Sequence, residues 1–166
     1  MTDRIYNCLF LCTHNSARSI LSEGLMNDLG RGRFRAFSAG SFPSGKVNPF
    51  ALATLEAMGI STRELRSKSW QEFASPDAPE MDFIITVCDN AAGEVCPIWP
   101  GKPASAHWGV EDPSAMEGSD GEKRAEFERV AAILRSRIEL LLAMPASEMD
   151  ASSVSRRLRE IGEVRG

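Results

Sequence analysis

A cysteine and an arginine are the first pair of residues in this sequence whose spacing suggests chemistry. Cys12 and Arg18 are separated by five residues, and Ser19 follows directly. The apolar run 5–11 precedes the cysteine and a helical pattern follows the arginine, which predicts a strand, a tight turn and a helix N-terminus. Backbone amides of such a turn point at a bound anion, and the helix dipole adds partial positive charge. A guanidinium matches two oxygens of a tetrahedral oxyanion at once. The spacing therefore predicts an oxyanion-binding loop that begins with a thiol.

The positive potential of this loop would activate the thiol. It is expected to lower the pKa of Cys12 below the free value of about 8.5, which gives a thiolate at neutral pH. Ser19 can donate a hydrogen bond to that thiolate, and Asn15 can brace the loop through bonds to the backbone. A thiolate beside a bound oxyanion can attack its central atom. A buried cysteine at the end of a strand, with a surface arginine, is the alternative. The residues expected to bind the anion are Thr13, His14, Asn15, Ser16, Ala17, Arg18 and Ser19.

A nucleophilic attack on an oxyanion also needs a proton for the leaving oxygen. Asp112 is the candidate general acid, because it follows the predicted strand 104–108 at the same sheet edge as Cys12, and Pro113 stiffens its loop. An aspartate that only caps a turn or helix is the alternative. His107 could also donate a proton, but its position within the strand pattern predicts a side chain packed in the core.

Two further cysteines exceed the needs of simple hydrolysis. Cys88 follows the third predicted strand, and Cys96 comes eight residues later. On a continuous helix their Cα atoms would be about 12 Å apart, whereas a disulfide needs roughly 4.4 to 6.8 Å. The pair can bridge only if the segment between them unwinds, and its polar residues and glycine make a marginal helix. These features favour a thiol relay, in which Cys88 attacks Cys12 and Cys96 then attacks Cys88. Two unrelated cysteines are the alternative, and a zinc site is disfavoured because no Cys-x-x-Cys pair is present.

Strand and helix patterns alternate along the chain. Strands are predicted at 5–11, 34–39, 81–87 and 104–108, and helices at 19–29, 49–59, 119–144 and 152–161. This order predicts a three-layer α/β/α domain with a parallel four-stranded sheet and a ligand at the carboxyl ends of its strands. We expect one domain over residues 1–166, in which about 150–166 form a tail helix docked on the surface.

Composition excludes several classes of function. The net charge of −4 and the pI of about 5.3 argue against nucleic acid or an anionic membrane as the main partner. The sequence shows no secretory signal and no membrane span, so a cytoplasmic protein is expected. Four cysteines in 166 residues do not indicate a disulfide scaffold, and Cys8 is predicted to pack in the core. A monomer is expected.

Three motifs together resemble one family. The Cys-x5-Arg-Ser loop, the cysteine pair after the third strand and the segment His-Trp-Gly-x-x-Asp-Pro are similar to those of thioredoxin-coupled arsenate reductases, which share the fold of low-molecular-weight tyrosine phosphatases. The resemblance covers 5–142. It implies reduction of arsenate to arsenite in arsenic detoxification, and a loop that phosphate or sulfate can also occupy. It also implies no bound cofactor and an external reductant: thioredoxin, glutaredoxin or a low-molecular-weight thiol. By position, Cys12 resembles the nucleophile, Arg18 the oxyanion ligand, Cys88 and Cys96 the second and third thiols, and Asp112 the acid.

The sequence also departs from the family pattern. His14 stands where the family loop usually has glycine, so it would be strained if that position needs a positive φ. Some members bind potassium near the loop with residues such as Asn15, Glu23 and Ser38. Here Lys68 takes the place of one acidic ligand. Its ammonium is expected to replace the ion, so no metal is predicted.

Two other functions share part of this site. A protein tyrosine phosphatase would use the same Cys12, Arg18 and Asp112. Phosphatases of this fold usually carry tyrosines after Asp-Pro to grip an aryl ring, but Ser114 follows here and Tyr6 is the only tyrosine. This favours a small inorganic substrate. A non-enzymatic sensor of oxyanions or redox state is the third possibility, and the absence of a separable output domain counts against it.

Overall fold

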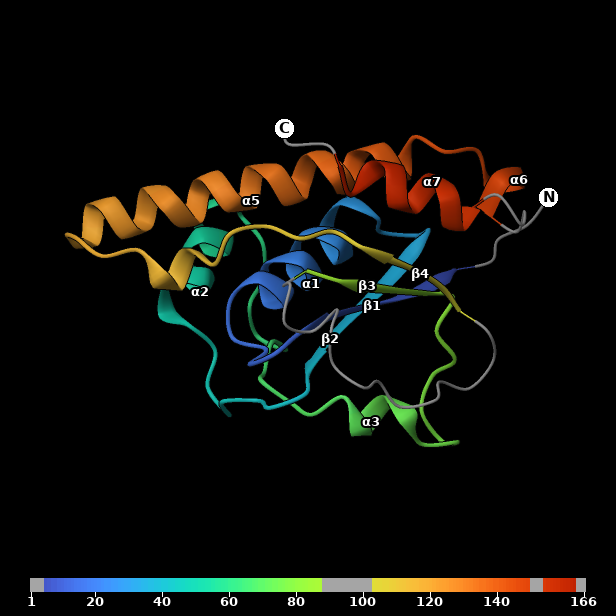
Figure 1. Cartoon of the computed structure of the whole chain (residues 1–166), viewed down its shortest axis with the longest axis horizontal. Helices are drawn as coiled ribbons and strands as arrows, with labels where there is room; N and C mark the ends of the chain where they lie inside the picture. The colour runs from blue at the N-terminus through green and yellow to red at the C-terminus, as the bar shows by residue number, and fades with distance from the viewer. Residues whose placement is uncertain (1–4, 88–102, 150–153, 164–166) are drawn as a thin grey trace.

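A four-stranded parallel sheet forms the centre of the molecule. The computed structural model describes residues 5–87, 103–149 and 154–163. Its strands are β1 (Tyr6–Cys12), β2 (Phe34–Gly40), β3 (Phe83–Thr86) and β4 (Ala104–His107). They lie in the order β2-β1-β3-β4, and all neighbouring pairs are parallel. The predicted parallel sheet is therefore confirmed, and the carboxyl ends of its strands meet at one edge (Figure 1).

Helices cover both faces of the sheet. They are α1 (Arg18–Leu29), α2 (Pro49–Ala57), α3 (Gln71–Ala74), the 3-10 helix η1 (Pro113–Ala115), α5 (Asp120–Leu142), α6 (Ala146–Met149) and α7 (Val154–Ile161). The helices α1, α2, α5 and α7 lie on one side of the sheet, and the short α3 lies on the other (Figure 1). This arrangement confirms the three-layer α/β/α class.

The alternation of side chains along β1 divides the core in two. Cys8 and Phe10 face the larger cluster under α1 and α5, whereas Leu9 and Leu11 face the smaller cluster around Trp70. Cys8 is fully buried, as predicted. Burial raises the pKa of its thiol, so Cys8 is an unreactive core residue.

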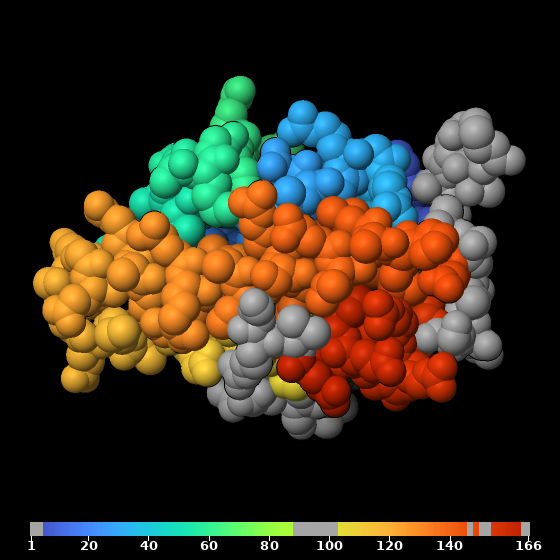
Figure 2. Space-filling view, turned by 90° about the horizontal axis from the view of Figure 1, so that it is seen from above, coloured from blue at the N-terminus to red at the C-terminus, as the bar shows by residue number. Residues whose placement is uncertain are grey.

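The long helix α5 spans the molecule and carries α7 beside it (Figure 2). Its start is a capping box, in which the Ser119 side chain accepts a hydrogen bond from the Glu122 amide and Glu122 reaches back to Ser119. In α7, Val154, Leu158 and Ile161 are buried, so this part of the predicted tail packs against the rest of the protein. Within the described residues, no helix has both the length and the apolar character needed to cross a membrane.

The outer edge of β2 is covered by the chain itself. The side-chain amide of Asn27 donates to the Ala36 carbonyl at 3.1 Å and accepts from the Ala36 amide at 2.8 Å. Farther along, Gly40 donates to the Lys68 carbonyl at 2.9 Å and accepts from the Trp70 amide at 3.0 Å. These contacts occupy outward backbone groups at two places along the edge strand.

Candidate active site

The predicted loop lies between β1 and α1. Cys12 is the last residue of β1 and is buried, and α1 begins at Arg18. The residue that precedes the helix, Ala17, makes no side-chain cap hydrogen bond. The first amides of α1 therefore have no capping side chain at that position, and this leaves the helix N-terminus suited to an anion.

Three carbonyls of the loop point toward the segment 42–48. The hydrogen-bonded pairs are Thr13 O with Phe42 N at 2.9 Å, His14 O with Ser44 N at 3.1 Å, and Ser16 O with Asn48 N at 2.9 Å. In a trans peptide the carbonyl and the following amide point in opposite directions. The amides of His14, Asn15 and Ala17 therefore point away from that segment, as in an anion-binding nest.

Asn15 holds the loop from within. Its side chain is fully buried, and its Nδ2 donates to the hydroxyls of Ser19 at 2.8 Å and Ser38 at 3.0 Å. Its Oδ1 accepts from the Lys68 amide at 2.9 Å. The expected bracing role of Asn15 is confirmed. Gly40 is also required here, because a Cβ at that position would overlap the Thr13 carbonyl.

The strained position of the loop differs from the one expected. The positive φ falls on Asn15, at 48°, and not on His14. Asparagine tolerates this left-handed conformation better than most residues, and three side-chain bonds hold it there. His14 is exposed, with Nδ1 3.2 Å from the Phe42 carbonyl. In the sequence, the asparagine itself indicates which loop residue has the positive φ.

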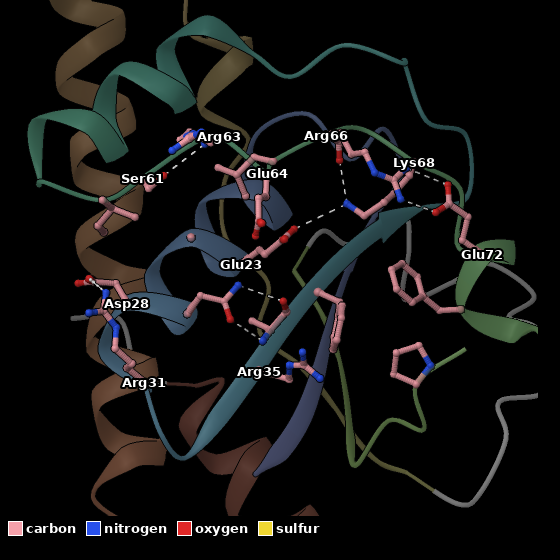
Figure 3. Close-up of a pocket in the computed structure, with 18 residues that line it drawn as sticks. Glu23, Asp28, Arg31, Arg35, Ser61, Arg63, Glu64, Arg66, Lys68 and Glu72 are labelled. Carbon is pink, nitrogen blue, oxygen red and sulfur yellow. Dashed lines mark hydrogen bonds and ion pairs between the residues drawn. The ribbon is translucent and has the colours of Figure 1, made fainter. Parts of the chain in front are cut away.

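A buried pair of opposite charges lies beneath the loop. Lys68 Nζ is 3.7 Å from Glu23 Oε1 and donates to the Arg66 carbonyl at 2.8 Å (Figure 3). The same Glu23 oxygen accepts a hydrogen bond from Ser38 at 2.5 Å. Glu23 and Lys68 are 8% and 7% exposed. The ammonium therefore lies beside the acid as expected, while the absence of a bound metal stays a prediction.

Burial dominates the titration of this pair. It raises the pKa of Glu23, an effect that Lys68 and Ser38 partly offset. It lowers the pKa of Lys68, which Glu23 partly offsets. Each residue thus limits the cost of burying the other. Through Ser38 and Asn15, the pair is hydrogen-bonded to the anion loop.

Asp112 and Arg18 meet at the carboxyl edge of the sheet. Arg18 Nη2 is 3.6 Å from Asp112 Oδ2, and Arg18 Nη1 donates to the Val110 carbonyl at 2.9 Å. Asp112 also caps η1, because its Oδ1 accepts from the Ser114 amide at 3.0 Å and the Ser114 hydroxyl at 2.6 Å. One carboxylate oxygen of Asp112 therefore caps a turn, and the other faces the arginine, while its role as the general acid stays a prediction.

A buried arginine that the sequence analysis did not identify fixes the loop before Asp112. Arg137 of α5 is 1% exposed, and its Nη1 donates to the carbonyls of Trp108 at 2.8 Å and Gly109 at 3.1 Å. The sequence does indicate that Arg137 is buried, because it lies three residues after Leu134 and four before Leu141 on the apolar stripe. A charged residue at a core position needs a buried partner.

The prediction that His107 packs in the core is wrong. His107 is exposed, and its Nδ1 is 2.7 Å from the Thr86 hydroxyl. It is the last residue of β4, which is the end strand of the described sheet, so the side chain is not covered. His107 instead lines a cleft of about 610 Å³ that also contains Arg18 and Asp112.

A larger hollow lies elsewhere on the molecule. A groove of about 1040 Å³ runs beside β2, and charged side chains such as Arg35, Arg63 and Glu64 line it (Figure 3). It reaches the buried Glu23–Lys68 pair but contains neither Cys12 nor Asp112 among its described lining residues. Cys12 is not among the described lining residues of the smaller cleft either, but Arg18 and Asp112 meet there, so we place the acid side of the site at that cleft.

The other two predicted thiols, Cys88 and Cys96, lie outside the described residues. In the part of the chain that the structure describes, no group of three or more histidine, cysteine or acidic side chains is arranged to hold a metal ion. The structure therefore brings together the anion loop, Arg18 and Asp112, and places the Glu23–Lys68 pair beneath them.

Comparisons with known proteins agree with this geometry. The sequence pattern of the family described as low molecular weight phosphotyrosine protein phosphatase matches residues 7–154. An arsenate reductase of Halalkalibacterium halodurans is 37% identical over 130 residues, which cover 78% of this chain and 90% of that protein. A glutaredoxin arsenate reductase of Synechocystis is 30% identical over 135 residues, or 81% of this chain and 95% of that protein.

Solved structures give the same result. An arsenate reductase in its phosphate-binding state superposes with a TM-score of 0.67 and 30% sequence identity, over 84% of this chain and 98% of that one. The fold, the anion loop and the extent of these matches lead to one conclusion. The chain belongs to the low molecular weight phosphotyrosine protein phosphatase family.

Proposed function

We propose that this protein is an arsenate reductase of the cytoplasm that acts as a monomer and converts arsenate to arsenite. The observation that carries the proposal is the anion loop between Cys12 and Arg18, whose carbonyls face outward and whose amides face the opposite way. Relatives named arsenate reductase, at 30 to 37% identity, support arsenate as the oxyanion.

The first step is covalent capture of arsenate. The loop amides and Arg18 bind the oxyanion and stabilise its charge. The Cys12 thiolate attacks arsenic and forms an arsenic–sulfur bond, and one oxygen leaves as water. Asp112 supplies a proton to that leaving oxygen. Arsenic is still pentavalent at this stage.

The second step reduces arsenic. The Cys88 thiolate attacks the Cys12 sulfur and forms a Cys12–Cys88 disulfide. The electron pair of the broken arsenic–sulfur bond stays on arsenic, which leaves as arsenite. Cys96 then attacks Cys88, so Cys12 is released as a thiolate and a Cys88–Cys96 disulfide remains. The two electrons gained by arsenic are thus the two lost by the thiols.

An external dithiol completes the cycle. We propose thioredoxin as the reductant that cleaves the Cys88–Cys96 disulfide, and no cofactor bound to the chain. The name of the Synechocystis relative supports a glutaredoxin as the other candidate. Turnover with purified thioredoxin, compared with glutaredoxin plus glutathione, identifies the reductant.

Cysteine variants test the relay. Arsenate-dependent oxidation of the reductant and hydrolysis of an aryl phosphate would be measured for Cys12→Ser, Cys88→Ser and Cys96→Ser, with Cys8→Ser as the control for a thiol outside the relay. We expect Cys12→Ser to lose both activities. Cys88→Ser and Cys96→Ser should lose arsenate turnover and keep any aryl phosphate hydrolysis. Full arsenate turnover in Cys88→Ser would contradict the relay.

Phosphomonoester hydrolysis is the second candidate, and the family match favours it. It needs only Cys12, Arg18 and Asp112, with Asp112 as the acid for the leaving group. Asp112→Asn should lower aryl phosphate hydrolysis by about 10²-fold or more. A protein that hydrolyses aryl phosphate efficiently but does not consume arsenate would be a phosphatase.

A further inference from the structure

The C-terminal helix α7 lies at the end of the family match and next to the cleft that contains Arg18 and Asp112. The family pattern ends at residue 154, where α7 begins. The helix packs on the side of α5 and on β4 (Figures 1 and 2). This chain therefore places a helix beside the segment that carries Asp112.

The position of α7 is fixed by contacts with the end of β4. The indole of Trp108 donates to the Leu158 carbonyl at 2.8 Å in a buried position. Gly162 lies so close to the end of β4 that a Cβ at this position would overlap the His107 carbonyl and come within 2.8 Å of Trp108 Cδ1. With Leu158 fully buried, α7 is held as part of the cleft wall.

Two charged residues of this helix region face the cleft. Arg159 and Glu163 line it together with Arg18 and Asp112. The two other acids of the cleft each have a cationic neighbour. Asp112 Oδ2 lies 3.6 Å from Arg18 Nη2, and Glu111 Oε2 lies 3.6 Å from Arg129 Nη2.

In contrast, Arg159 is exposed and takes part in no ion pair within the described residues. Its neighbour Arg157 pairs with Glu160 at 3.5 Å. Arg159 is thus the cation of α7 that is both in the cleft and available to a ligand.

We propose that Arg159 is a steering residue that attracts the arsenate dianion toward Arg18, which lines the same cleft, and so raises the local arsenate concentration at the loop that Arg18 closes. The net charge of the chain is −4, so attraction of an anion must come from local cations. Glu163, four residues later on the same wall, opposes this effect. The inference rests on the proposed function for the identity of the anion, and on the shared cleft for its location.

The test compares charge variants at two ionic strengths. Arg159→Ala, Arg159→Glu and Glu163→Gln would be assayed for kcat and KM with arsenate, with Arg156→Ala as the control. Arg156 is exposed on the same helix and is absent from the described lining of the cleft. Ionic strengths of about 0.01 M and 1 M give Debye lengths of about 30 Å and 3 Å.

Arg159→Ala should raise KM about threefold to fivefold at low ionic strength and leave kcat unchanged. Arg159→Glu should raise KM further, and Glu163→Gln should lower it. These differences should fall below about twofold at high ionic strength, because salt screens exposed charges. Arg156→Ala should match the parent protein. If Arg159→Ala also matches the parent at low ionic strength, the inference is overturned.

A second measurement separates this inference from the proposed function. Inorganic phosphate should protect Cys12 from alkylation by iodoacetamide, and Arg159→Ala should need about threefold to fivefold more phosphate for the same protection. If the parent protein does not consume arsenate but this shift in protection occurs, the proposed function fails and the steering role stands. If arsenate is consumed and no shift occurs, only the steering role fails.

Discussion

The two halves of the active site are held in different ways. The anion loop is fixed by segments close to it in space, mostly through backbone groups of 42–48 and the buried side chain of Asn15. The segment before Asp112 is fixed by helices that come later in the chain, through Arg137 of α5 and the α7 backbone at Leu158.

This difference separates binding from proton delivery. The loop needs its own strand, turn and helix, together with a polar support beneath it. The acid loop depends on the docking of α5 and α7 against the end of β4. Changes that disturb the packing of the anion loop should therefore alter anion affinity, and changes that loosen the docking of the acid loop should alter kcat. Substitution of the exposed Arg159 changes only a surface charge of α7 and leaves that docking in place.

Replacement of the loop arginine should have the largest effect. Arg18→Lys keeps the charge but loses the planar fork that matches two oxygens. We expect kcat/KM for arsenate to fall by about 10² to 10³-fold, and phosphate to protect Cys12 poorly from alkylation. Arg31→Lys, at an exposed position just after the end of α1, is the matched control and should be neutral. Activity within twofold of the parent in Arg18→Lys would contradict the assignment.

Loss of Arg137 should disrupt the other half of the site, the segment before Asp112. Arg137→Met removes the donor to the Trp108 and Gly109 carbonyls, so unfolding free energy should fall by about 3 kcal/mol. Below the melting transition, kcat should fall while protection of Cys12 by phosphate stays nearly unchanged. Arg135→Met, exposed on the same helix, is the control and should change stability by less than about 0.5 kcal/mol. Equal losses in kcat and in phosphate affinity would show that the two halves are not separate.

Removal of the ammonium beneath the loop should have an intermediate effect. Lys68→Met leaves Glu23 buried without its cation, at a cost of about 2 kcal/mol. This is below the usual range for a buried pair because the two charged atoms are 3.7 Å apart.

The loss of stability in Lys68→Met should depend on pH. Burial already raises the pKa of Glu23, and removal of Lys68 raises it further. A raised carboxyl pKa means that stability is lost as pH rises through the titration, so the deficit should shrink as pH falls toward about 4.5. Chemical denaturation at several pH values would measure this, with exposed Lys46→Met as the control. A deficit independent of pH would contradict the pairing. In Lys68→Asp, a melting temperature that rises with potassium chloride but not lithium chloride would indicate that the ammonium replaces an ion.

The smallest effect concerns the seating of α7. Gly162→Ala introduces a Cβ that overlaps the His107 carbonyl, which should cost about 1 kcal/mol and loosen the helix. Gly121→Ala is the control, because a Cβ there meets only Ser119 Oγ at 3.8 Å. Differential scanning calorimetry would compare the two variants. Equal melting temperatures would indicate that α7 can shift without cost.

Much of the fold was predictable from the sequence because it depends on local patterns. The apolar run 5–11, the helical repeat after Arg18 and the long amphipathic stripe of α5 each produced the expected element. The loop between Cys12 and Arg18 was equally local, since its residue types and spacing describe an anion site within one short segment.

The rest depended on contacts between distant segments. Arg137 and Trp108 are 29 residues apart in sequence, and Trp108 and Leu158 are 50 apart, so periodicity could not join them. The exposure of His107 followed from its place at the end of an outer strand, which strand patterns do not reveal. The positive φ lies at Asn15 and not at the unusual His14, because asparagine tolerates this conformation better than most residues.

The contact between Asn27 and Ala36 has a consequence for behaviour at high concentration. A lone outer strand offers its amides and carbonyls to any extended peptide, including another copy of the same chain. Here an amide side chain from α1 occupies those groups as a neighbouring strand would. Asn27→Ala should therefore increase edge-to-edge assembly of the chain at high concentration, which light scattering would detect.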